Sequence, residues 1–583
     1  MLTGAQLVAK CLANEGVEVT FGMCGHTNLA LLDALRYETN IRFISVRHEQ
    51  VAAHAADGYS RVTHKPGVLI LHVGPGMTNA VTGVVTAAQD STPMVVIAGD
   101  IQSYYFGRDP HQEVKMHIDA SQYEIYRPFV KRAWRVNDVS QFPDILARAF
   151  NIATSGRPGP VLIDVPMDIY SETAPEGVSL DVTRKVTGRR IAGDQAEVSR
   201  AVKMLAEAER PLIYAGGGVI MSEAWSQLAE LAEYLAIPVA TSLMGKGAIP
   251  EDHPLSVGMT GVYGTPVANE LTRTADVILA VGTRFTEFDT SSWNPKYCFA
   301  IPPARLIHVD IDNEEIGKTY PVEVGIQGDA RAVLEQMAEA AKDTTKRKDL
   351  ATDPRVREIR SRMAAWYAAV EPNQRAKSSP IRPERILREV REILSPEDII
   401  VTDTGWNKNG VGNQFPIYRP MTHLAPGGFA TMGFGTAAVI GAKIGRPDRV
   451  ALALIGDGAF SSVTPALATA VESGVSPIWV VMNNYSYGVI TGLQRRNFKR
   501  TAWTEFVREE SGEAYNPDFA ALARAYGVEG VKVEDPEEFK PALEKAVKSG
   551  QPYVLDVIMD KEATIPVGGL WDVNTVLEKG ARR

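Results

Sequence analysis

VALALIGDGAF, residues 450–460, places Asp457 between two glycines directly after an unbroken apolar run. Runs of this kind, apolar on both faces, recur along the chain between longer amphipathic segments. They are typical of parallel strands that are covered by helices on both sides. Other examples are GVLILHVG (67–74), PMVVIAGD (93–100), RPLIYAGGG (210–218), DVILAVG (276–282) and PIWVVMNN (477–484). The sequence therefore predicts an α/β fold with several parallel sheets.

Size and composition limit the class of protein and its partners. With 583 residues, of which 45% are apolar and 22% charged, the chain is predicted to be an ordinary soluble globular protein with more than one domain. Its net charge of −9 argues against nucleic acid or an anionic membrane as a partner, because both attract basic surfaces. We therefore expect small molecules as ligands.

The cysteine content and the N-terminus bear on the compartment. Three cysteines are too few and too scattered for a disulfide framework or a Cys-x-x-Cys metal site. The N-terminal segment lacks the basic start and apolar core of a signal peptide, and no later apolar run has the length of a membrane span. These features predict a cytoplasmic protein.

Two polar stretches interrupt the alternation of apolar runs and amphipathic segments. One begins at about Ser171 and the other at Lys342, and both have the charge and weak periodicity of connectors, although some helix is expected in the second. We divide the chain there into three domains of parallel sheet flanked by helices. The predicted units are residues 1–175, 190–340 and 375–565, followed by a C-terminal tail, residues 566–583.

The strand before Asp457 and the next predicted strand, which ends at Asn483 and Asn484, suggest a metal site. Ligands bind at the carboxyl edge of parallel sheets, where helix N-termini favour phosphate. A carboxylate and an amide oxygen suit magnesium that holds a diphosphate, and the glycines beside Asp457 let the backbone approach phosphate oxygens. The simpler interpretation is a strand-to-helix turn in which Asp457 only caps the helix. The two asparagines favour the metal site.

These residues carry a resemblance to a known family. Gly-Asp-Gly at 456–458, followed after one predicted helix and one strand by Asn-Asn, resembles the diphosphate–magnesium motif of thiamine diphosphate enzymes. HEQVAAHAADGYSR (48–61) is similar to a segment of acetolactate synthases and supplies Glu49. The resemblance covers nearly the whole chain. It implies that the first domain binds the pyrimidine of thiamine diphosphate and that the third domain binds the diphosphate.

The resemblance implies that Glu49 activates the coenzyme. A carboxylic acid that is hydrogen-bonded to the aminopyrimidine promotes the tautomer that takes a proton from the thiazolium carbon. An apolar pocket raises the pKa of a carboxyl group toward neutrality, which would let Glu49 exchange that proton. An isolated glutamate at such a place is more simply a solvated residue near a helix N-terminus. The two motifs of the diphosphate end favour the catalytic role.

Further ligands follow from the same resemblance. Asp457 and Asn484 would bind magnesium through their side chains, and Ser486 through its backbone carbonyl. Met432 would be an apolar wedge that forces the two coenzyme rings together. The other implied coenzyme contacts are Asn407, Ala430, Gly458, Ala459 and Gly488. Because different subunits usually bind the two coenzyme ends in this family, we expect a homodimer or homotetramer with active sites at the subunit interface.

The middle domain is similar to the flavin-binding domain of acetolactate synthases. Glycines at its predicted strand ends would admit the pyrophosphate of a dinucleotide, with Arg157 and Arg284 as candidate charge partners. FAD is therefore a candidate cofactor. The alternative is a domain that keeps the fold without the ligand, as in some relatives.

Two positions depart from the acetolactate synthases. Phe288 stands where those enzymes carry an arginine that binds the acceptor, and Leu493 stands where they carry a tryptophan. An arginine pairs with a substrate carboxylate in a way that phenylalanine cannot imitate. The synthesis of acetolactate itself is therefore open to question on the sequence.

The first domain adds groups that can carry protons. His26 replaces the small residues usual in the corresponding loop of the synthases, and His72 stands where benzoylformate decarboxylase has a catalytic histidine. Gln112 lies in a loop that resembles the glutamine-bearing loop of the synthases. A single histidine in a strand is more often a hydrogen-bonded core residue. Two of them at strand ends that face one cofactor predict proton transfer.

Together these features predict a thiamine diphosphate-dependent enzyme, a lyase or carboligase that acts on a 2-oxo acid or a 1,2-diketone through an enamine on the coenzyme. One alternative is a 1,2-dione hydrolase or NAD-coupled oxidoreductase, because the Gly-His-Thr turn at 25–27 resembles cyclohexane-1,2-dione hydrolase. The other is a non-catalytic regulator that binds the cofactor. A regulator has no need of the acid supplied by Glu49, so we favour the enzyme.

Overall fold

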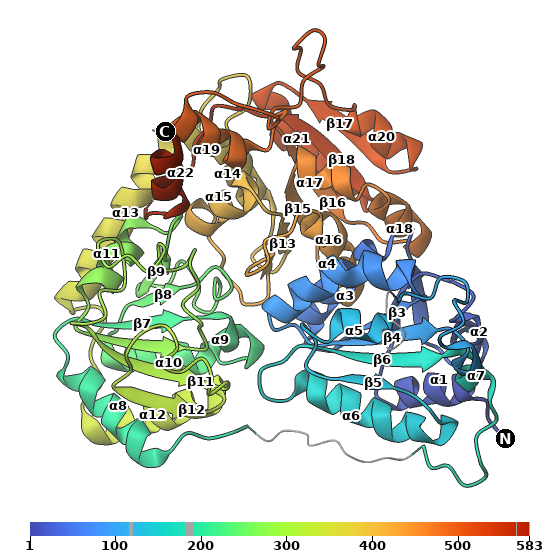
Figure 1. Cartoon of the computed structure of the whole chain (residues 1–583). Helices are drawn as coiled ribbons and strands as arrows, with labels where there is room; N and C mark the ends of the chain where they lie inside the picture. Colours follow the sequence, from blue (N-terminus) through green and yellow to red (C-terminus); the bar gives the residue numbers. More distant parts are fainter. Residues whose placement is uncertain (116–120, 181–189, 567, 582–583) are drawn as a thin grey trace.

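The computed structural model describes residues 1–115, 121–180, 190–566 and 568–581. Within these residues the chain forms three six-stranded sheets, one in each third of the sequence, and their strands pair in parallel (Figure 1). The predicted α/β class with three domains of parallel sheet is confirmed. The predicted connector from Ser171 and the C-terminal tail lie partly outside the described residues.

The first sheet has the strand order β2-β1-β3-β4-β6-β5. Its central strands β3 (Gly67–Leu71), β4 (Met94–Asp100) and β6 (Pro160–Pro166) are buried at every residue, because helices cover both faces. The outer strands are β1 (Val19–Gly22), β2 (Arg42–Ser45) and β5 (Ala133–Arg135). The helices of this domain are α1 (Gly4–Asn14), α2 (Leu29–Glu38), α3 (Glu49–Thr63), α4 (Pro75–Gln89), η1 (Ser103–Tyr105), α5 (Gln122–Tyr126), η2 (Val139–Gln141), α6 (Phe142–Thr154) and α7 (Met167–Ser171).

The middle sheet has the order β12-β11-β10-β7-β8-β9. Its strands are β7 (Pro211–Ala215), β8 (Val239–Thr241), β9 (Ser256–Met259), β10 (Val277–Val281), β11 (Arg305–Asp310) and β12 (Val324–Gln327). Its helices are α8 (Gln195–Glu207), α9 (Gly217–Met221), α10 (Trp225–Leu235), α11 (Pro266–Thr274) and α12 (Ala330–Thr344). Helices α8, α10 and α12 cover one face, and α11 covers the other together with α13 (Pro354–Gln374). The helix expected in the second connector is therefore α13.

The third sheet has the order β14-β13-β15-β16-β18-β17. Its strands are β13 (Ile399–Thr402), β14 (His423–Leu424), β15 (Ala451–Gly456), β16 (Ile478–Asn483), β17 (Glu529–Val533) and β18 (Tyr553–Ile558). Its helices are α14 (Pro383–Ile393), α15 (Trp406–Gln414), α16 (Phe434–Gly445), α17 (Asp457–Ser462), α18 (Ala466–Ser473), α19 (Gly488–Phe498), α20 (Phe519–Ala525) and α21 (Pro536–Ser549). The run that opened the sequence analysis is β15, at the centre of this sheet. In the tail, α22 (Val573–Ala581) packs beside α19 (Figure 1).

The first and third domains share one hydrophobic core through helices α3 and α16. The two helices cross closely because small residues face each other. A Cβ atom added to Gly58 of α3 would lie 2.1 Å from the carbonyl oxygen of Ala438, and one added to Gly441 of α16 would lie 1.7 Å from that of Ala55. Contacts this short leave no room for a side chain at either glycine unless the helices move apart. The crossing therefore fixes α3, which begins at Glu49, against the third domain.

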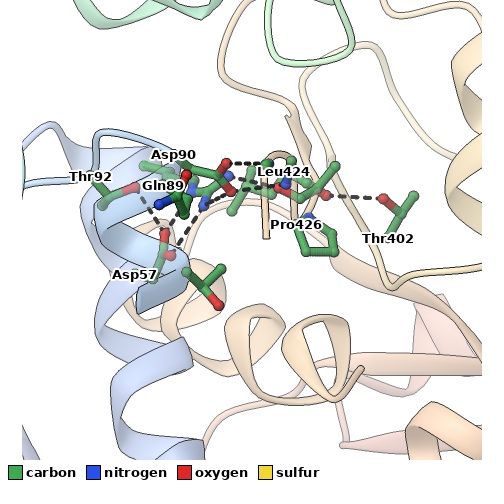
Figure 2. Close-up of polar contacts among 12 residues, drawn as sticks. Asp57, Gln89, Asp90, Thr92, Thr402, Leu424 and Pro426 are labelled. Carbon is green, nitrogen blue, oxygen red and sulfur yellow. Dashed lines mark hydrogen bonds and ion pairs between the residues drawn. The ribbon is translucent and has the colours of Figure 1, made fainter. Parts of the chain in front are cut away.

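A buried charged network joins the same two domains (Figure 2). The Arg61 guanidinium is bonded to both oxygens of Asp57 and donates to Asp90 Oδ2 at 2.9 Å and to the carbonyl oxygen of Ala425 at 2.8 Å. Asp90 in turn accepts the backbone N–H groups of residues 427 and 428 at 2.9 and 2.7 Å. The network holds the segment after β14 in place, and this segment enters the site described next.

No helix among the described residues is both long and apolar enough to cross a membrane.

Candidate active site

A cavity of about 530 Å³ lies between the middle and third domains. Its wall takes residues from the carboxyl ends of β15 and β16, from the N-terminal part of α15, from the segment 427–432, and from the middle-domain segment 284–289. Gln89 of the first domain and Trp571 of the C-terminal tail also line it. The position agrees with the general rule that ligands bind at the carboxyl edge of parallel sheets.

Asp457 and Asn484 meet on one wall of this cavity. Strands β15 and β16 are paired in parallel with Gly456 opposite Met482, so their carboxyl ends lie side by side. Asp457 begins α17 immediately after β15, and Asn484 follows β16. Ser486 and Gly488 line the same wall.

The Asp457 carboxylate is buried, with 1% of its surface exposed. Burial raises its pKa to about 6, and hydrogen bonds from Asn516 and from the backbone N–H of Gly458 oppose that rise. The Asn516 amide donates to Asp457 Oδ2 and to Asn483 Oδ1, both at 2.8 Å. Asn516 therefore orients the carboxylate from a loop that the sequence motifs do not mark.

The residues on this wall fit a magnesium ion bound to a diphosphate. Asp457, Asn484 and the backbone carbonyl of Ser486 are hard oxygen donors. A Cβ atom at Gly458 would lie 2.7 Å from Tyr487 Cε1, and one at Gly488 would lie 2.5 Å from Asn484 Nδ2, so a side chain would fill the space at both positions. Within the described part of the chain no group of three or more histidine, cysteine or acidic side chains could hold a metal by itself. A cation here would therefore bind Asp457 together with amide and backbone oxygens rather than a cluster of acidic side chains.

Asp403 fixes the segment that carries Ala430 and Met432 by accepting hydrogen bonds from the backbone that follows it. This fully buried carboxylate accepts the backbone N–H groups of Gly433 at 3.1 Å and Gly435 at 2.7 Å, and burial raises its pKa to about 7. Ala430 has φ of 49° and Gly433 has φ of 91°, so the chain turns sharply before α16. Ala430 and the partly exposed Met432 both line the cavity, as does Ala459 of α17.

Helix α15 places two polar side chains in the cavity wall. Asn407 is 2% exposed, and its Oδ1 accepts the backbone N–H of Asp403 at 3.0 Å. Lys408 is 5% exposed, and burial lowers its pKa. A buried lysine with a lowered pKa in a cavity is a functional candidate. Our sequence analysis missed Lys408, although it stands next to Asn407.

Aromatic side chains form the wall on the middle-domain side. The Phe288 ring lies 5.1 Å from the Trp571 ring and 5.7 Å from the Tyr263 ring, measured between centroids. The tail reaches this wall because the backbone N–H of Gly569 donates to the carbonyl oxygen of Val262 at 3.1 Å. Trp571 was also missed, since no sequence pattern places the tail. Leu493, the other departure from the synthases, does not line the cavity within the described residues.

Glu49 lies in the first domain and does not line this cavity. It is the first residue of α3 and is 1% exposed. Its Oε2 accepts a hydrogen bond from the Asn79 amide at 3.0 Å. Gly76 lies between Glu49 and His72. A Cβ atom at Gly76 would be 3.4 Å from Glu49 Oε1 and 3.1 Å from His72 Cβ. Glu49 and His72 are therefore neighbours.

The predicted proton carriers form a cluster around His72. Its Nε2 lies 2.8 Å from Gln112 Oε1, and its Nδ1 lies 2.9 Å from the Thr27 hydroxyl. Because the Gln112 oxygen can only accept, Nε2 carries the proton, and Nδ1 accepts from Thr27 when the ring is neutral. The ring of the exposed His26 lies 4.7 Å from that of His72. Burial, followed by the charges of His72 and His111, lowers the pKa of His26.

The predicted site residues thus form two groups in one chain. Asp457, Asn484 and Ser486, with the six implied coenzyme contacts of the third domain, line the cavity. Glu49, His26, His72 and Gln112 cluster in the first domain and, among the described residues, contribute nothing to the cavity wall. The two groups approach each other at Gln50, next to Glu49, which donates to the Met432 carbonyl oxygen at 3.4 Å.

Arg157 and Arg284 line a second cavity, of about 390 Å³, at the carboxyl edge of the middle sheet. Arg157 forms an ion pair with Glu315 at 3.1 Å, and Arg284 donates to the carbonyl oxygen of Gln89 at 2.6 Å. Asp310, at the end of β11, is also in this wall, and burial raises its pKa to about 6. Gly217, Gly218, Gly282 and Gly328 also line it, and Gly218 and Gly282 pack against each other, because a Cβ atom at Gly282 would lie 2.6 Å from Gly218 Cα.

Comparison with known proteins decides the family. Three models of the thiamine pyrophosphate enzyme match the chain: the N-terminal TPP binding domain at residues 2–122, the central domain at 198–337 and the C-terminal TPP binding domain at 403–557. The chain belongs to the thiamine pyrophosphate enzyme family. The predicted resemblance is confirmed, and with it a thiamine diphosphate-dependent enzyme.

Two relatives cover nearly all of this thiamine pyrophosphate enzyme. The probable acetolactate synthase large subunit of Methanocaldococcus jannaschii is 36% identical over 576 residues, which are 97% of this chain and 93% of that protein. Acetolactate synthase isozyme 3 large subunit of Escherichia coli is 34% identical over 569 residues, 96% of this chain and 95% of that protein. The predicted activity, an acetolactate synthase-like lyase or carboligase, is confirmed at this level. The hydrolase, oxidoreductase and regulator alternatives are not favoured.

Proposed function

We propose that this thiamine pyrophosphate enzyme joins two carbonyl compounds, at least one of them a 2-oxo acid. The acid would lose carbon dioxide, its acyl carbon would add to the carbonyl carbon of an acceptor, and the acceptor oxygen would take up a proton. The observation that carries the proposal is that Asp457, Asn484 and Met432 line one cavity with the aromatic wall around Phe288. The cavity thus offers a seat for a magnesium diphosphate beside room for a small organic substrate.

We propose roles for the residues of the cavity. Asp457, Asn484 and the Ser486 carbonyl would hold magnesium, and Asn407, Gly458, Ala459 and Gly488 would contact the diphosphate. Ala430 and Met432 would support the coenzyme ring from below. Bound there, thiamine diphosphate supplies a carbon nucleophile and an electron sink. The protein contributes position, exclusion of water and control of protons.

We propose that the active site is completed by a second copy of the chain. Glu49 is buried, accepts a hydrogen bond from Asn79 and does not line the cavity, although the neighbouring Gln50 donates to the Met432 carbonyl oxygen at 3.4 Å. In a homodimer or homotetramer, Glu49 of one copy would bind the pyrimidine of a coenzyme whose diphosphate the other copy holds. His26, His72 and Gln112 would then face the reacting atoms and handle protons.

We propose that residues 1–175 form the pyrimidine-binding domain and residues 375–565 the diphosphate-binding domain. The middle domain, residues 190–340, would bind FAD in the second cavity. The enzyme would act in the cytoplasm. Arg157 and Arg284 in the wall of this cavity, at the carboxyl edge of a parallel sheet, support a dinucleotide there. The visible absorption spectrum of the pure protein tests this assignment, because bound flavin is coloured. A colourless protein that binds no added FAD would refute it.

The proposed reaction is tested with a panel of 2-oxo acids and 1,2-diketones, with and without added aldehydes, and product analysis by mass spectrometry. We expect carbon dioxide together with a hydroxyketone or 2-hydroxy-3-oxo acid, and dependence on both thiamine diphosphate and magnesium. Cleavage of a dione to an acid and an aldehyde, without a new carbon–carbon bond, would favour the hydrolase instead.

A further inference from the structure

A buried lysine in the cavity wall has no role in the function proposed so far. Lys408 of α15 is 5% exposed, and its ammonium donates a hydrogen bond to the carbonyl oxygen of Pro426 at 3.3 Å. Among the described residues no carboxylate lies close enough to form an ion pair with it. The contrast is Lys246, which is equally buried but donates to both oxygens of Glu251 at 2.7 Å.

Three carboxylates surround Lys408 at longer range, namely Asp90, Asp403 and Asp289. Their charges favour the ammonium form, but each already accepts hydrogen bonds from other groups. Burial is the largest effect on Lys408, and it lowers the pKa. A buried charge without an anionic partner is unfavourable, so an anionic ligand at this position would gain a strong, charge-assisted contact.

Apolar rings lie next to this ammonium. Lys408 Nζ is 5.9 Å from the centre of the Phe288 ring, and the Phe288 ring packs against the rings of Trp571 and Tyr263. The wall thus offers the Lys408 ammonium beside an apolar surface, whereas Arg284, which also lines the cavity, donates to the carbonyl oxygen of Gln89. A small molecule with a carboxylate at one end and a short hydrocarbon side chain at the other matches the ammonium and the apolar surface.

We propose that Lys408 binds the carboxylate of the acceptor, and that the acceptor is a 2-oxo acid whose apolar side chain packs on Phe288, Trp571 and Tyr263. The inference rests on the carboligation proposed above and names its acceptor class. Lys408 would supply, from α15, the positive charge that position 288 lacks.

The chemistry assigns the lysine to the acceptor rather than to the donor. The donor carboxylate loses its charge as carbon dioxide leaves, so an ammonium bound to it would stabilise the starting state more than the transition state and slow that step. The acceptor carboxylate keeps its charge throughout the formation of the new bond. An ammonium partner therefore binds the acceptor without opposing the reaction.

Binding tests the inference without turnover. The protein saturated with thiamine diphosphate and magnesium is titrated with 2-hydroxybutanoate and with its neutral amide, using tryptophan fluorescence, to which the wall residues Trp406 and Trp571 contribute. We expect the acid to bind at least about tenfold more tightly than the amide, as for a buried charge-assisted pair. Lys408→Met should abolish that preference, Lys408→Arg should keep most of it, and the control Lys246→Met should leave it unchanged.

A rate measurement supplements the binding test. With pyruvate as donor, Lys408→Met should lower kcat/KM at least about tenfold more for 2-oxobutanoate than for propanal, which lacks the carboxylate. Equal binding of acid and amide to the wild type, or an acid preference that survives in Lys408→Met, would overturn the inference. If the preference depends on Lys408 but no donor gives a carbon–carbon product, the lysine assignment stands and the proposed function fails.

Discussion

The Asn516 amide donates to Asp457 Oδ2 at 2.8 Å, and the same nitrogen donates to Asn483 Oδ1 at 2.8 Å. One side chain thus ties together the carboxyl ends of β15 and β16, where the proposed magnesium seat lies. A residue that orients a ligand in this way commonly matters for metal affinity almost as much as the ligand does. Asn516→Ala should weaken magnesium binding in the presence of thiamine diphosphate by roughly 10-fold to 100-fold. Calorimetric titration measures the change, and an unchanged affinity would remove Asn516 from the site.

The crossing of α3 and α16 predicts a large effect of one methyl group. Gly441→Ala would place its Cβ 1.7 Å from the Ala55 carbonyl oxygen, so the helices must separate. We expect a loss of about 1–3 kcal/mol in the free energy of unfolding, and a lower melting temperature. Gly492→Ala in α19 is the matched control, because its Cβ meets nothing within 4 Å. It should be neutral or raise stability by up to about 1 kcal/mol. Equal melting temperatures for the two variants would contradict the packing.

His54 predicts a dependence of stability on pH. It is fully buried against Phe434, and burial lowers its pKa from 6.5 to about 3. Below pH 6.5 the unfolded chain gains a proton at His54 that the folded chain does not, so this contribution to stability is lost as pH falls toward 3. His54→Leu removes the effect. As pH falls from 6.5 to 3, the free energy of unfolding of the variant should rise relative to that of the wild type by up to about 1.4 kcal/mol for each pH unit. Melting temperatures at pH 7.5, 6.0 and 5.0 measure the gain, and a constant difference would contradict it.

The separation of Glu49 from the cavity predicts complementation between subunits. Glu49→Gln and Asp457→Ala should each be inactive alone. If each site takes Glu49 from one copy and Asp457 from the other, co-expression in equal amounts makes half of the dimers mixed, each with one intact site. About a quarter of the wild-type specific activity should return. No return of activity in mixed dimers, verified with two affinity tags, would place the whole site within one chain.

The fold, and the approach of Asp457 to Asn484, could be predicted because both follow from local pattern. Strands that are apolar on both faces indicate a parallel sheet covered by helices on both sides. The carboxyl ends of neighbouring parallel strands lie side by side at one edge of the sheet. Asp457 and Asn484 therefore come together for reasons visible in the sequence. For helix α13 the sequence predicts some helical structure but not its bounds, because the apolar residues of this segment show only weak helical periodicity.

Other parts of the site depend on loop and tail segments whose positions in the fold cannot be predicted from sequence patterns. Asn516 reaches Asp457 from a loop, and Trp571 reaches Phe288 from the tail. Lys408 stands inside a motif, but only the structure shows that it is buried without an ion pair among the described residues. The hydrogen bond from His72 to Gln112 joins residues 40 positions apart in sequence. Such contacts arise from tertiary packing.

The central claim is that Glu49 is the acid that activates a coenzyme seated at Asp457. The most direct measurement is the rate of hydrogen–deuterium exchange at the thiazolium carbon of bound thiamine diphosphate, followed by NMR in the wild type and in Glu49→Gln. We predict that the variant binds the coenzyme with nearly unchanged affinity, while the exchange rate falls by at least about 100-fold, as for loss of a positioned acid or base. Exchange at the wild-type rate in Glu49→Gln would contradict the account.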